Sequence, residues 1–179
     1  HKISFNFIQR GIRHHSYIII SKFFEKSILF FKNFAKNTLP ENDRHFLEIN
    51  GANSSATVYL NGKELAVHHG GYSTWRVNIT DVLEETNTIA VIVDNAPTEL
   101  VYPQTADFTF YGGIYRDVNI ISVDETHFDL EYWGGNGLKI TPVMKDGNAE
   151  VEIEVFAKNL GDGDAFLYEV TDAAGTVVF

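Results

Sequence analysis

Apolar and polar residues alternate in short runs through the middle of the chain, and turn residues bound each run. In Ala56–Leu60 the apolar side chains recur at every second position, which is the period of a half-buried strand. Asn61-Gly62 separates this run from Lys63–His68, and Asn-Gly between two such runs predicts a β-hairpin, because both turn residues need positive φ. Further strands are predicted at His45–Asn50, Trp75–Ile79, Thr88–Val93 and Asp117–Val123.

Two features of this pattern bear on the architecture. Thr88–Val93 is nearly all apolar, which predicts a strand buried on both faces. Thr80–Leu83 has the character of a single helical turn, and no longer helical periodicity occurs. Many short strands at intervals of about ten residues indicate an all-β fold, an antiparallel β-sandwich.

A second unit is predicted from about Asp124. Strands at Leu138–Met144 and Ala149–Phe156 flank the turn sequence Lys145–Asn148. The second strand alternates valine and isoleucine with three glutamates, which favours a solvated sheet face over a metal site. Two more strands are predicted at Phe166–Thr171 and Thr176–Phe179. Four strands in about 55 residues are too few for a seven-stranded sandwich, so the second unit is expected to be truncated.

Composition excludes several classes of protein. The chain has 179 residues, no cysteine and a net charge of −10, with 14 Lys and Arg against 24 Asp and Glu. The absence of cysteine excludes disulfides, thiolate metal sites and a cysteine nucleophile. The acidic balance disfavours a nucleic-acid partner, because phosphate contacts need a cationic face.

The first part of the chain differs from the rest. Residues 1–44 hold eight Lys and Arg against three acidic residues, together with seven of the 14 phenylalanines. Its apolar runs are broken by charges and are far shorter than the roughly 20 residues that cross a bilayer, so no membrane partner is expected. Residues 1–29 are therefore set apart as a basic, Phe-rich leader with no assigned role, with an amphipathic surface helix as the alternative.

Familiar catalytic and metal motifs are absent. No P-loop, dinucleotide fingerprint, HExxH or GxSxG sequence occurs, and no cofactor or metal is expected. His68 and His69 point to opposite faces of a strand and cannot chelate one ion together. Asp162-Gly163-Asp164 lacks the other ligands of a calcium loop and indicates a turn.

Two residues are candidates for ligand contact. Asp107 lies in a polar, aromatic stretch, Thr105–Gly113, between predicted strands. A carboxylate accepts hydrogen bonds from sugar hydroxyl groups, while aromatic rings cover the apolar face of the sugar. A loop-capping Asp beside core aromatics is the alternative. Asn61 is the second candidate, although its hairpin turn alone explains an asparagine there.

Four stretches together resemble the amino-terminal sugar-binding domain of family 2 glycoside hydrolases, the β-galactosidase and β-glucuronidase family. Their order and spacing match the family over Phe46–Val123, and His127–Pro142 resembles the start of the family's next, immunoglobulin-like domain. The stretches are FLEINGANSSATVYLNGKEL (Phe46–Leu65), HHGGYSTWRVNITDVL (His68–Leu83), NTIAVIVDN (Asn87–Asn95) and DFTFYGGIYRDVNI (Asp107–Ile120).

The resemblance implies a fold and a domain order. Residues 30–123 would form a galactose-binding-type jelly-roll β-sandwich, with FFKNF (Phe30–Phe34) as its first strand. Residues 124–179 would form part of an immunoglobulin-like β-sandwich. The resemblance also implies that Asn61 and Asp107 hydrogen-bond the sugar in the active-site pocket, whereas Arg116 and Asp117 would form a structural charged pair.

Catalysis by this family uses two glutamates on a (β/α)8 barrel of about 250 residues, which this chain does not include. The resemblance therefore implies no catalytic residue here. It implies the non-catalytic part of a retaining β-glycosidase, with β-galactosidase favoured. This part is expected to be inactive alone. Its expected partners are the barrel of the same polypeptide and a β-linked sugar, with a galactoside favoured. A stand-alone carbohydrate-binding module and a purely structural β-sandwich are the alternatives.

Overall fold

The structure is a computed structural model that describes residues 2–5, 27–102, 106–107, 110–170, 174 and 176–177. Within these ranges the chain forms fourteen strands and two short 3-10 helices, η1 (Lys36–Thr38) and η2 (Thr80–Val82). No helix in the described ranges is long and apolar enough to cross a membrane. The prediction of an all-β fold is confirmed.

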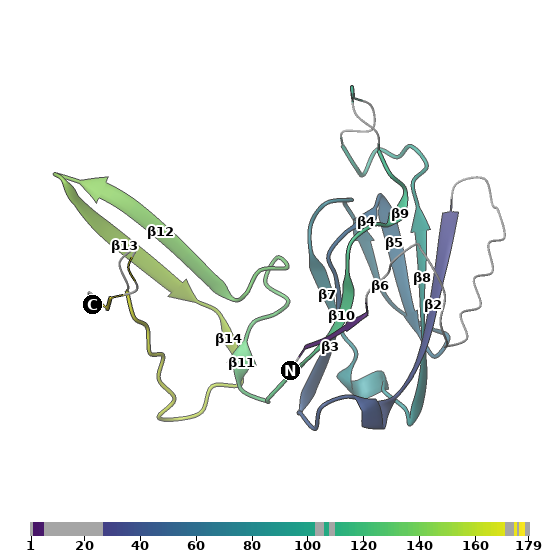
Figure 1. The fold of residues 1–179 in the computed structure, drawn as a ribbon, viewed down its shortest axis with the longest axis horizontal. Helices are drawn as coiled ribbons and strands as arrows, with labels where there is room; N and C mark the ends of the chain where they lie inside the picture. The colour runs from purple at the N-terminus through teal and green to yellow at the C-terminus, as the bar shows by residue number, and fades with distance from the viewer. Residues whose placement is uncertain are drawn as a thin grey trace.

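The first unit is a sandwich of two four-stranded antiparallel sheets (Figure 1). One sheet has the strand order β1-β10-β3-β7 and the other β2-β8-β5-β6. Their strands are β1 (Lys2–Phe5), β2 (Ser27–Ala35), β3 (Arg44–Ile49), β5 (Ser55–Leu60), β6 (Lys63–His69), β7 (Trp75–Asn78), β8 (Thr86–Asp94) and β10 (Val118–Val123). A small pair, β4 (Ala52–Asn53) with β9 (Gly113–Ile114), lies beside them.

One apolar core fills the space between the two sheets. Leu47, Ile49 and Ile120 from the first sheet are fully buried, as are Val58 and Val91 from the second. Along β5 and β8 of the second sheet the core residues alternate with more exposed ones, whereas β3 of the first sheet is buried on both faces from His45 to Ile49. In the second sheet the alternation seen in the sequence therefore places the core correctly.

The predicted strand of residues 88–93 needs a correction. It lies within β8, but β8 is covered on one face only: Val91 and Val93 are buried, whereas Ile92 is 38% exposed. β8 is an inner strand of its sheet, between β2 and β5. The outward-facing side chains of β8 are also apolar, so the run resembled a strand buried on both faces. An inner strand of a sheet and a strand covered on both faces can show the same apolar sequence pattern.

The leader is only partly described. Lys2–Phe5 forms β1, which pairs antiparallel with β10 from Lys2 opposite Ile121 to Phe5 opposite Val118. The sequence analysis did not expect this strand. Residues 6–26, most of the leader, lie outside the described residues. The strand predicted at Phe30–Phe34 is present as β2 and begins at Ser27.

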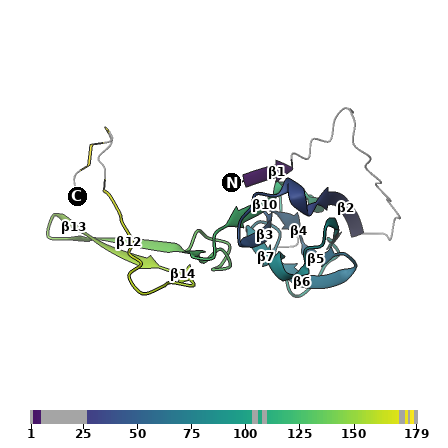
Figure 2. The ribbon, with the colours of Figure 1, turned by 90° about the horizontal axis from the view of Figure 1, so that it is seen from below.

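The second unit consists of two antiparallel pairs that extend to one side of the sandwich (Figures 1 and 2). β12 (Leu138–Lys145) and β13 (Asn148–Val155) form a hairpin through Asp146-Gly147, both with positive φ. β11 (His127–Phe128) pairs with β14 (Ala157–Lys158). The hairpin predicted from the sequence is confirmed.

The next predicted strand is not found. Residues 166–170 form no strand, and Thr171 lies outside the described residues. Apolar side chains such as Phe166 and Leu167 produced the prediction, but a strand also needs a neighbour for its backbone hydrogen bonds, and the described part of the chain provides none. Of the last predicted strand, Val177 forms an isolated bridge, and Val178 and Phe179 lie outside the described residues.

Candidate functional site

Asp107 lies on the long connection that leaves β8 at Asp94 and returns at β9. This connection forms the tip of the sandwich, at the top of Figure 1. Asp107 is exposed, and its carboxylate makes no hydrogen bond or ion pair with the other described residues. A carboxylate in this position is free to accept hydrogen bonds from a ligand.

Two other connections meet the Asp107 loop at the same end. Strand register requires this, because Ser55, the first residue of β5, lies opposite both Asp94 and His69, the last residue of β6. The turns before β5 and after β6 therefore lie beside the start of the Asp107 loop. We call this end of the sandwich, formed by the described residues among 50–54, 70–74 and 95–117, the loop end.

Asn53 is the most enclosed polar side chain of the loop end. It is only 5% exposed, and its Nδ2 donates a hydrogen bond of 2.9 Å to the Tyr111 carbonyl, four residues after Asp107. A Cβ atom at Gly71 would overlap Asn53 Oδ1, so only glycine fits there. The sequence analysis missed Asn53. No local signal in the sequence marks Asn53, because its burial depends on Gly71 and Tyr111, which lie far from it along the chain.

An exposed aromatic pair borders the loop end. Tyr72 and Tyr115 meet edge to face with centroids 6.3 Å apart, and the Tyr115 hydroxyl donates to the Gly71 carbonyl. The Arg116 guanidinium lies 5.3 Å from the Tyr115 ring centroid and donates to the Tyr72 carbonyl at 2.9 Å. Burial raises the pKa of the Tyr115 hydroxyl; Arg116 has a smaller effect that lowers it, and Tyr72 a smaller effect that raises it.

The charged pair predicted between Arg116 and Asp117 is not present. In the described structure Arg116 contacts two backbone carbonyls and an aromatic ring, and no ion pair joins it to Asp117. The structural role predicted for Arg116 is consistent with these contacts, although the partner is different.

Asn61 lies at the opposite end of the sandwich from Asp107. Leu60 pairs with Ile89, whereas the Asp107 loop begins after Asp94, five residues further along β8. At about 3.3 Å per residue this separates the two ends by about 16 Å, more than the width of one sugar ring. The structure therefore does not bring Asn61 and Asp107 together.

The amide of Asn61 is occupied by the protein itself. Its Nδ2 donates to Asn87 Oδ1 at 3.0 Å, and its Oδ1 accepts from the Thr88 backbone N–H at 2.8 Å. The φ of Asn61 is 52° and that of Gly62 is 80°, which confirms the predicted hairpin turn. These bonds tie the β5–β6 turn to β8.

The two histidines of β6 have separate surroundings. His68 stacks on Trp75 with ring centroids 4.7 Å apart, and burial lowers the pKa of His68. His69 Nδ1 lies 3.0 Å from Ser55 Oγ on the outer face of the sheet. No group of three potential metal ligands occurs among the described residues.

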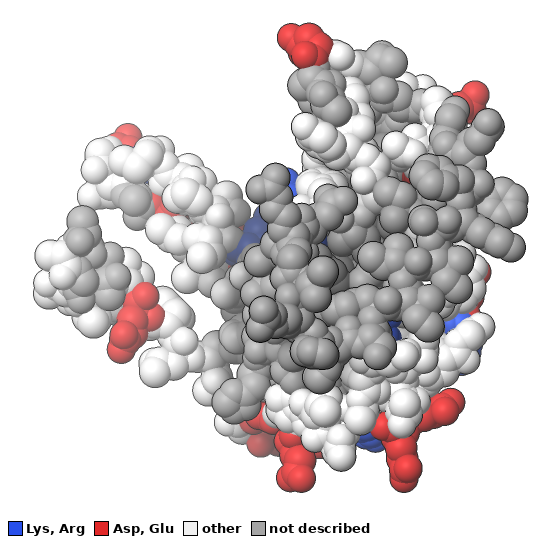
Figure 3. All heavy atoms as spheres, turned by 45° about the vertical axis from the view of Figure 1, so that its right-hand side comes forward, with Lys and Arg blue, Asp and Glu red and all other residues white. Residues whose placement is uncertain are grey.

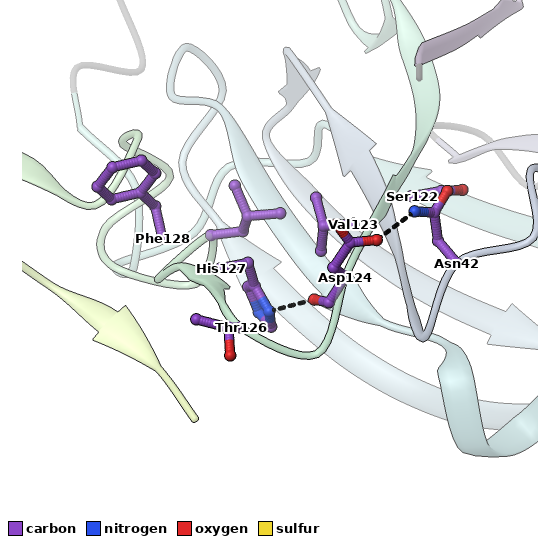
Figure 4. A pocket seen from close by; sticks show the side chains of 8 residues that line it. Asn42, Ser122, Val123, Asp124, Thr126, His127 and Phe128 are labelled. Carbon is purple, nitrogen blue, oxygen red and sulfur yellow. Dashed lines mark hydrogen bonds between the residues drawn. The ribbon is translucent and has the colours of Figure 1, made fainter. Parts of the chain in front are cut away.

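A shallow hollow of about 350 Å³ lies where the two units join (Figure 4). Its polar groups are already paired: Asn42 Nδ2 donates to Asp124 Oδ1 at 2.8 Å, and His127 Nδ1 lies 2.9 Å from the Asp124 carbonyl. The hollow therefore offers few free groups to a ligand. Its side chains instead hold the connection between the units.

Charge is distributed unevenly over the surface. In Figure 3 the acidic side chains gather mainly at the end of the sandwich opposite the loop end, and the Lys and Arg atoms among the described residues of this face form only small separate patches. No broad cationic surface for a polyanion is seen in this view.

The fold is that of a known family. The description glycosyl hydrolase 2 galactose-binding domain-like matches residues 18–111, more than half of the chain. The chain belongs to glycoside hydrolase family 2. The match includes β2, β3, β5 to β8 and Asp107, and it starts within the segment set apart as a leader.

Relatives of known name support this membership. The β-glucuronidase of Bacteroides fragilis is 37% identical over 139 residues, which cover 75% of this chain and 20% of the relative. The β-galactosidase of Thermoanaerobacter pseudethanolicus is 28% identical over 153 residues, covering 82% of this chain and 20% of the relative. The chain thus spans about a fifth of the length of these relatives.

Solved structures agree. An FMN-binding β-glucuronidase from Facaelibacterium prausnitzii L2-6 superposes with a TM-score of 0.74 at 39% identity, covering 85% of this chain and 24% of that one. A β-galactosidase, so named provisionally, from Bacteroides fragilis gives a TM-score of 0.72 at 30% identity, covering 88% and 24%. The all-β fold predicted from the sequence therefore matches the β-sandwich of these family 2 enzymes.

Proposed function

We propose that the chain is the non-catalytic, sugar-binding amino-terminal part of a family 2 β-glycosidase, and that its loop end contributes contacts to the active-site pocket. The observation that carries this proposal is the position of Asp107, exposed and unpaired among the described residues on the tip of a family 2 sandwich. The acid and the nucleophile would come from the remainder of the enzyme.

The chemistry of the loop end suits a sugar. The Asp107 carboxylate accepts hydroxyl hydrogen bonds, and exposed rings such as Tyr111, which is 71% exposed, cover apolar C–H faces. Asn53 holds the Tyr111 backbone and so fixes the base of the Asp107 loop. A charged hydrogen bond of this kind is worth about 1.5–3 kcal/mol, enough to orient a sugar but not to cleave it.

The substrate we place first is a β-glucuronide. Two β-glucuronidase relatives are 37% and 39% identical to the chain, compared with 28% for the Thermoanaerobacter β-galactosidase. The galactoside favoured by the sequence analysis is the second candidate. A β-glucuronide and a β-galactoside carry the same ring substituents except at two positions. Their stereochemistry differs at C4, and the glucuronide carries a carboxylate on C5.

The role of Asp107 is tested in a hybrid enzyme. Residues 27–170 replace the matching segment of the Bacteroides fragilis β-glucuronidase, and hydrolysis of 4-nitrophenyl β-D-glucuronide is measured. We expect the Asp107→Asn hybrid to lose at least tenfold in kcat/KM, equivalent to about 1.4 kcal/mol, without a change in Tm. Asp162→Asn, an exposed aspartate in a turn of the second unit, is the matched control and should leave kcat/KM unchanged.

Equal kinetics of the Asp107→Asn and parent hybrids would disprove the sugar contact. A second hybrid, built on the Thermoanaerobacter β-galactosidase, addresses the substrate. The kcat/KM of each hybrid is divided by the kcat/KM of the enzyme on which it is built. If the chain belongs to a β-glucuronidase, this fraction is larger for the glucuronidase hybrid than for the galactosidase hybrid. The 179-residue chain alone should hydrolyse neither substrate, and a submillimolar sugar Kd for it would favour the stand-alone binding module instead.

A further inference from the structure

The loop that joins β11 to β12, residues 129–137, is clamped onto the sandwich. Arg76 of β7 donates through Nη1 to the carbonyls of Leu130 at 2.9 Å and Gly135 at 2.6 Å. The Arg76 side chain is itself 95% buried and pairs with Glu48 at 2.8 Å. Two carbonyls near the two ends of the loop are thus held by one buried guanidinium.

Both neighbours of Trp133 within this loop are also fixed. Tyr132 stacks on Phe156 with ring centroids 3.9 Å apart. Gly134 lies so close to the sandwich that a Cβ atom there would overlap the Thr74 carbonyl oxygen. Trp133 is therefore held between two anchored residues.

Trp133 itself is turned into solvent. Its side chain is 88% exposed, the largest exposed fraction among the aromatic residues described, and its φ is +49°. A bulky non-glycine residue with positive φ is a genuine outlier that costs of the order of 1–2 kcal/mol. Neither the exposure nor the backbone conformation stabilises this chain, which points to a role in binding.

The other exposed residues of the loop are Glu131, Gly135 and Asn136. The Glu131 carboxylate and the Asn136 amide make no hydrogen bond with the described residues. An exposed aromatic ring in the same short loop as a free carboxylate and a free amide suits carbohydrate, because the ring covers axial C–H groups while the polar groups hydrogen-bond the hydroxyl groups.

We propose that Trp133, with Glu131 and Asn136, forms a carbohydrate-binding platform for a neutral hexose of a β-linked oligosaccharide. A neutral sugar fits because Glu131 would repel a uronate carboxylate. A protein partner fits less well, because stable protein interfaces bury above about 1,000 Å², and the loop itself offers one aromatic ring among polar residues. The platform is fixed to β7 through Arg76 and lies on the connection after β11, whereas Asp107 lies on the connection after β8.

The tryptophan content makes the test direct. The chain has two tryptophans, and the other, Trp75, is only 7% exposed within the core. The two indole N–H signals of the full 179-residue chain are recorded by NMR and assigned with the Trp133→Asn variant. Cellotriose and lactose are then titrated to about 50 mM. We expect the Trp133 signal to shift with a millimolar Kd, whereas the Trp75 signal stays in place.

Three variants define the platform. Trp133→Asn removes the ring and tolerates positive φ, so it should abolish binding while leaving Tm unchanged or higher. Asn136→Ala should raise the Kd at least threefold. Leu167→Ala is the control for the loss of an exposed apolar side chain, because Leu167 is 91% exposed in the same unit. This variant should not change the Kd. Asp107→Asn should leave the Trp133 shift intact, which separates this platform from the active-site contact proposed above.

Several results would overturn the proposal. An unmoved Trp133 signal at 50 mM of both sugars would exclude the platform. A clear fall in Tm for Trp133→Asn would show that the ring stabilises the fold. Shifts of the Trp133 signal that depend on protein concentration and not on sugar would identify contact between copies of the chain.

Discussion

Asn61 shows how a single side chain can serve the fold at a position where ligand contact was predicted. Its amide bonds both the Asn87 side chain and the Thr88 backbone, and Asn87 is itself fully buried. Asn87 in turn accepts from the Glu84 backbone N–H at 2.8 Å. One asparagine therefore connects the β5–β6 turn to the chain that enters β8.

We predict that Asn61→Gly lowers the free energy of unfolding by about 1–2 kcal/mol, because Asn87 and Thr88 lose partners while the positive φ remains easy to adopt. Asn61→Ala should cost about 1 kcal/mol more, since alanine is strained at φ 52°. Urea denaturation of the full chain measures both changes. A hybrid enzyme carrying Asn61→Gly that keeps its stability but loses tenfold in kcat/KM would show that the sugar contact is real.

Asp107 and Asn53 mark how far the candidate site could be predicted from sequence. Asp107 could be found because a lone acid among aromatic residues between two strands is visible in the sequence. Asn53 could not, because Ala52-Asn53-Ser54 resembles any turn. Its burial arises from Gly71 and from Tyr111, 58 residues away, which only the folded chain brings near.

At the scale of strands, local pattern predicted most of the sandwich. β3, β5, β6, β7 and β10 lie within one or two residues of their predicted bounds. Alternation of buried and more exposed residues explains this for β5 and β7, whereas β3 is buried on both faces. What could not be predicted depends on pairing across long distances. The outer face of β8, the pairing of β1 with β10, and the missing strand at residues 166–170 are all decided by neighbours distant in the sequence.

The outer face of the first sheet carries a buried polar row that crosses three strands. Asn119 of β10 donates to Glu48 of β3 at 2.9 Å, and Glu48 pairs with Arg76 of β7. Arg76 then reaches the carbonyls of Leu130 and Gly135. The row thus joins a sheet of the first unit to the loop that opens the second.

We predict that Arg76→Met lowers the free energy of unfolding by about 3–5 kcal/mol, because it leaves the Glu48 carboxylate buried without its cation. The double variant Glu48→Leu/Arg76→Met should recover part of this loss, since it removes both charges. Limited proteolysis should cut residues 129–137 faster in both variants, because the loop has lost its clamp. Equal protection of the loop in the double variant and the parent would contradict the role of Arg76.

Across the whole molecule, three groups make stability depend on pH in the same direction. His45 is 5% exposed, and burial, with a smaller effect from Lys36, lowers its pKa from the ordinary value of 6.5. Burial also lowers the pKa of His68. At the junction of the units, hydrogen bonds from Arg44 at 2.8 and 2.7 Å lower the pKa of Glu125.

Each lowered pKa means that the unfolded chain binds a proton before the folded chain does, so acid favours unfolding. For the two histidines the loss of stability begins as pH falls below 6.5, and for Glu125 it begins below 4.5, the ordinary value of a glutamate. The first step therefore belongs to the buried histidines. The second weakens the contact between the two units.

We predict that Tm is constant near pH 7.5 and falls by several degrees between pH 6.5 and 5, since about 1 kcal/mol corresponds to 2–4 °C in a chain of this size. His45→Gln should flatten part of this decline, because glutamine binds no proton in either state and can still meet Ser122, whose Oγ lies 2.9 Å from His45 Nδ1. His69→Gln, at an exposed position, should leave the decline unchanged. If both variants followed the parent curve, His68→Gln, which removes the ring stacked on Trp75, would be the next variant to measure.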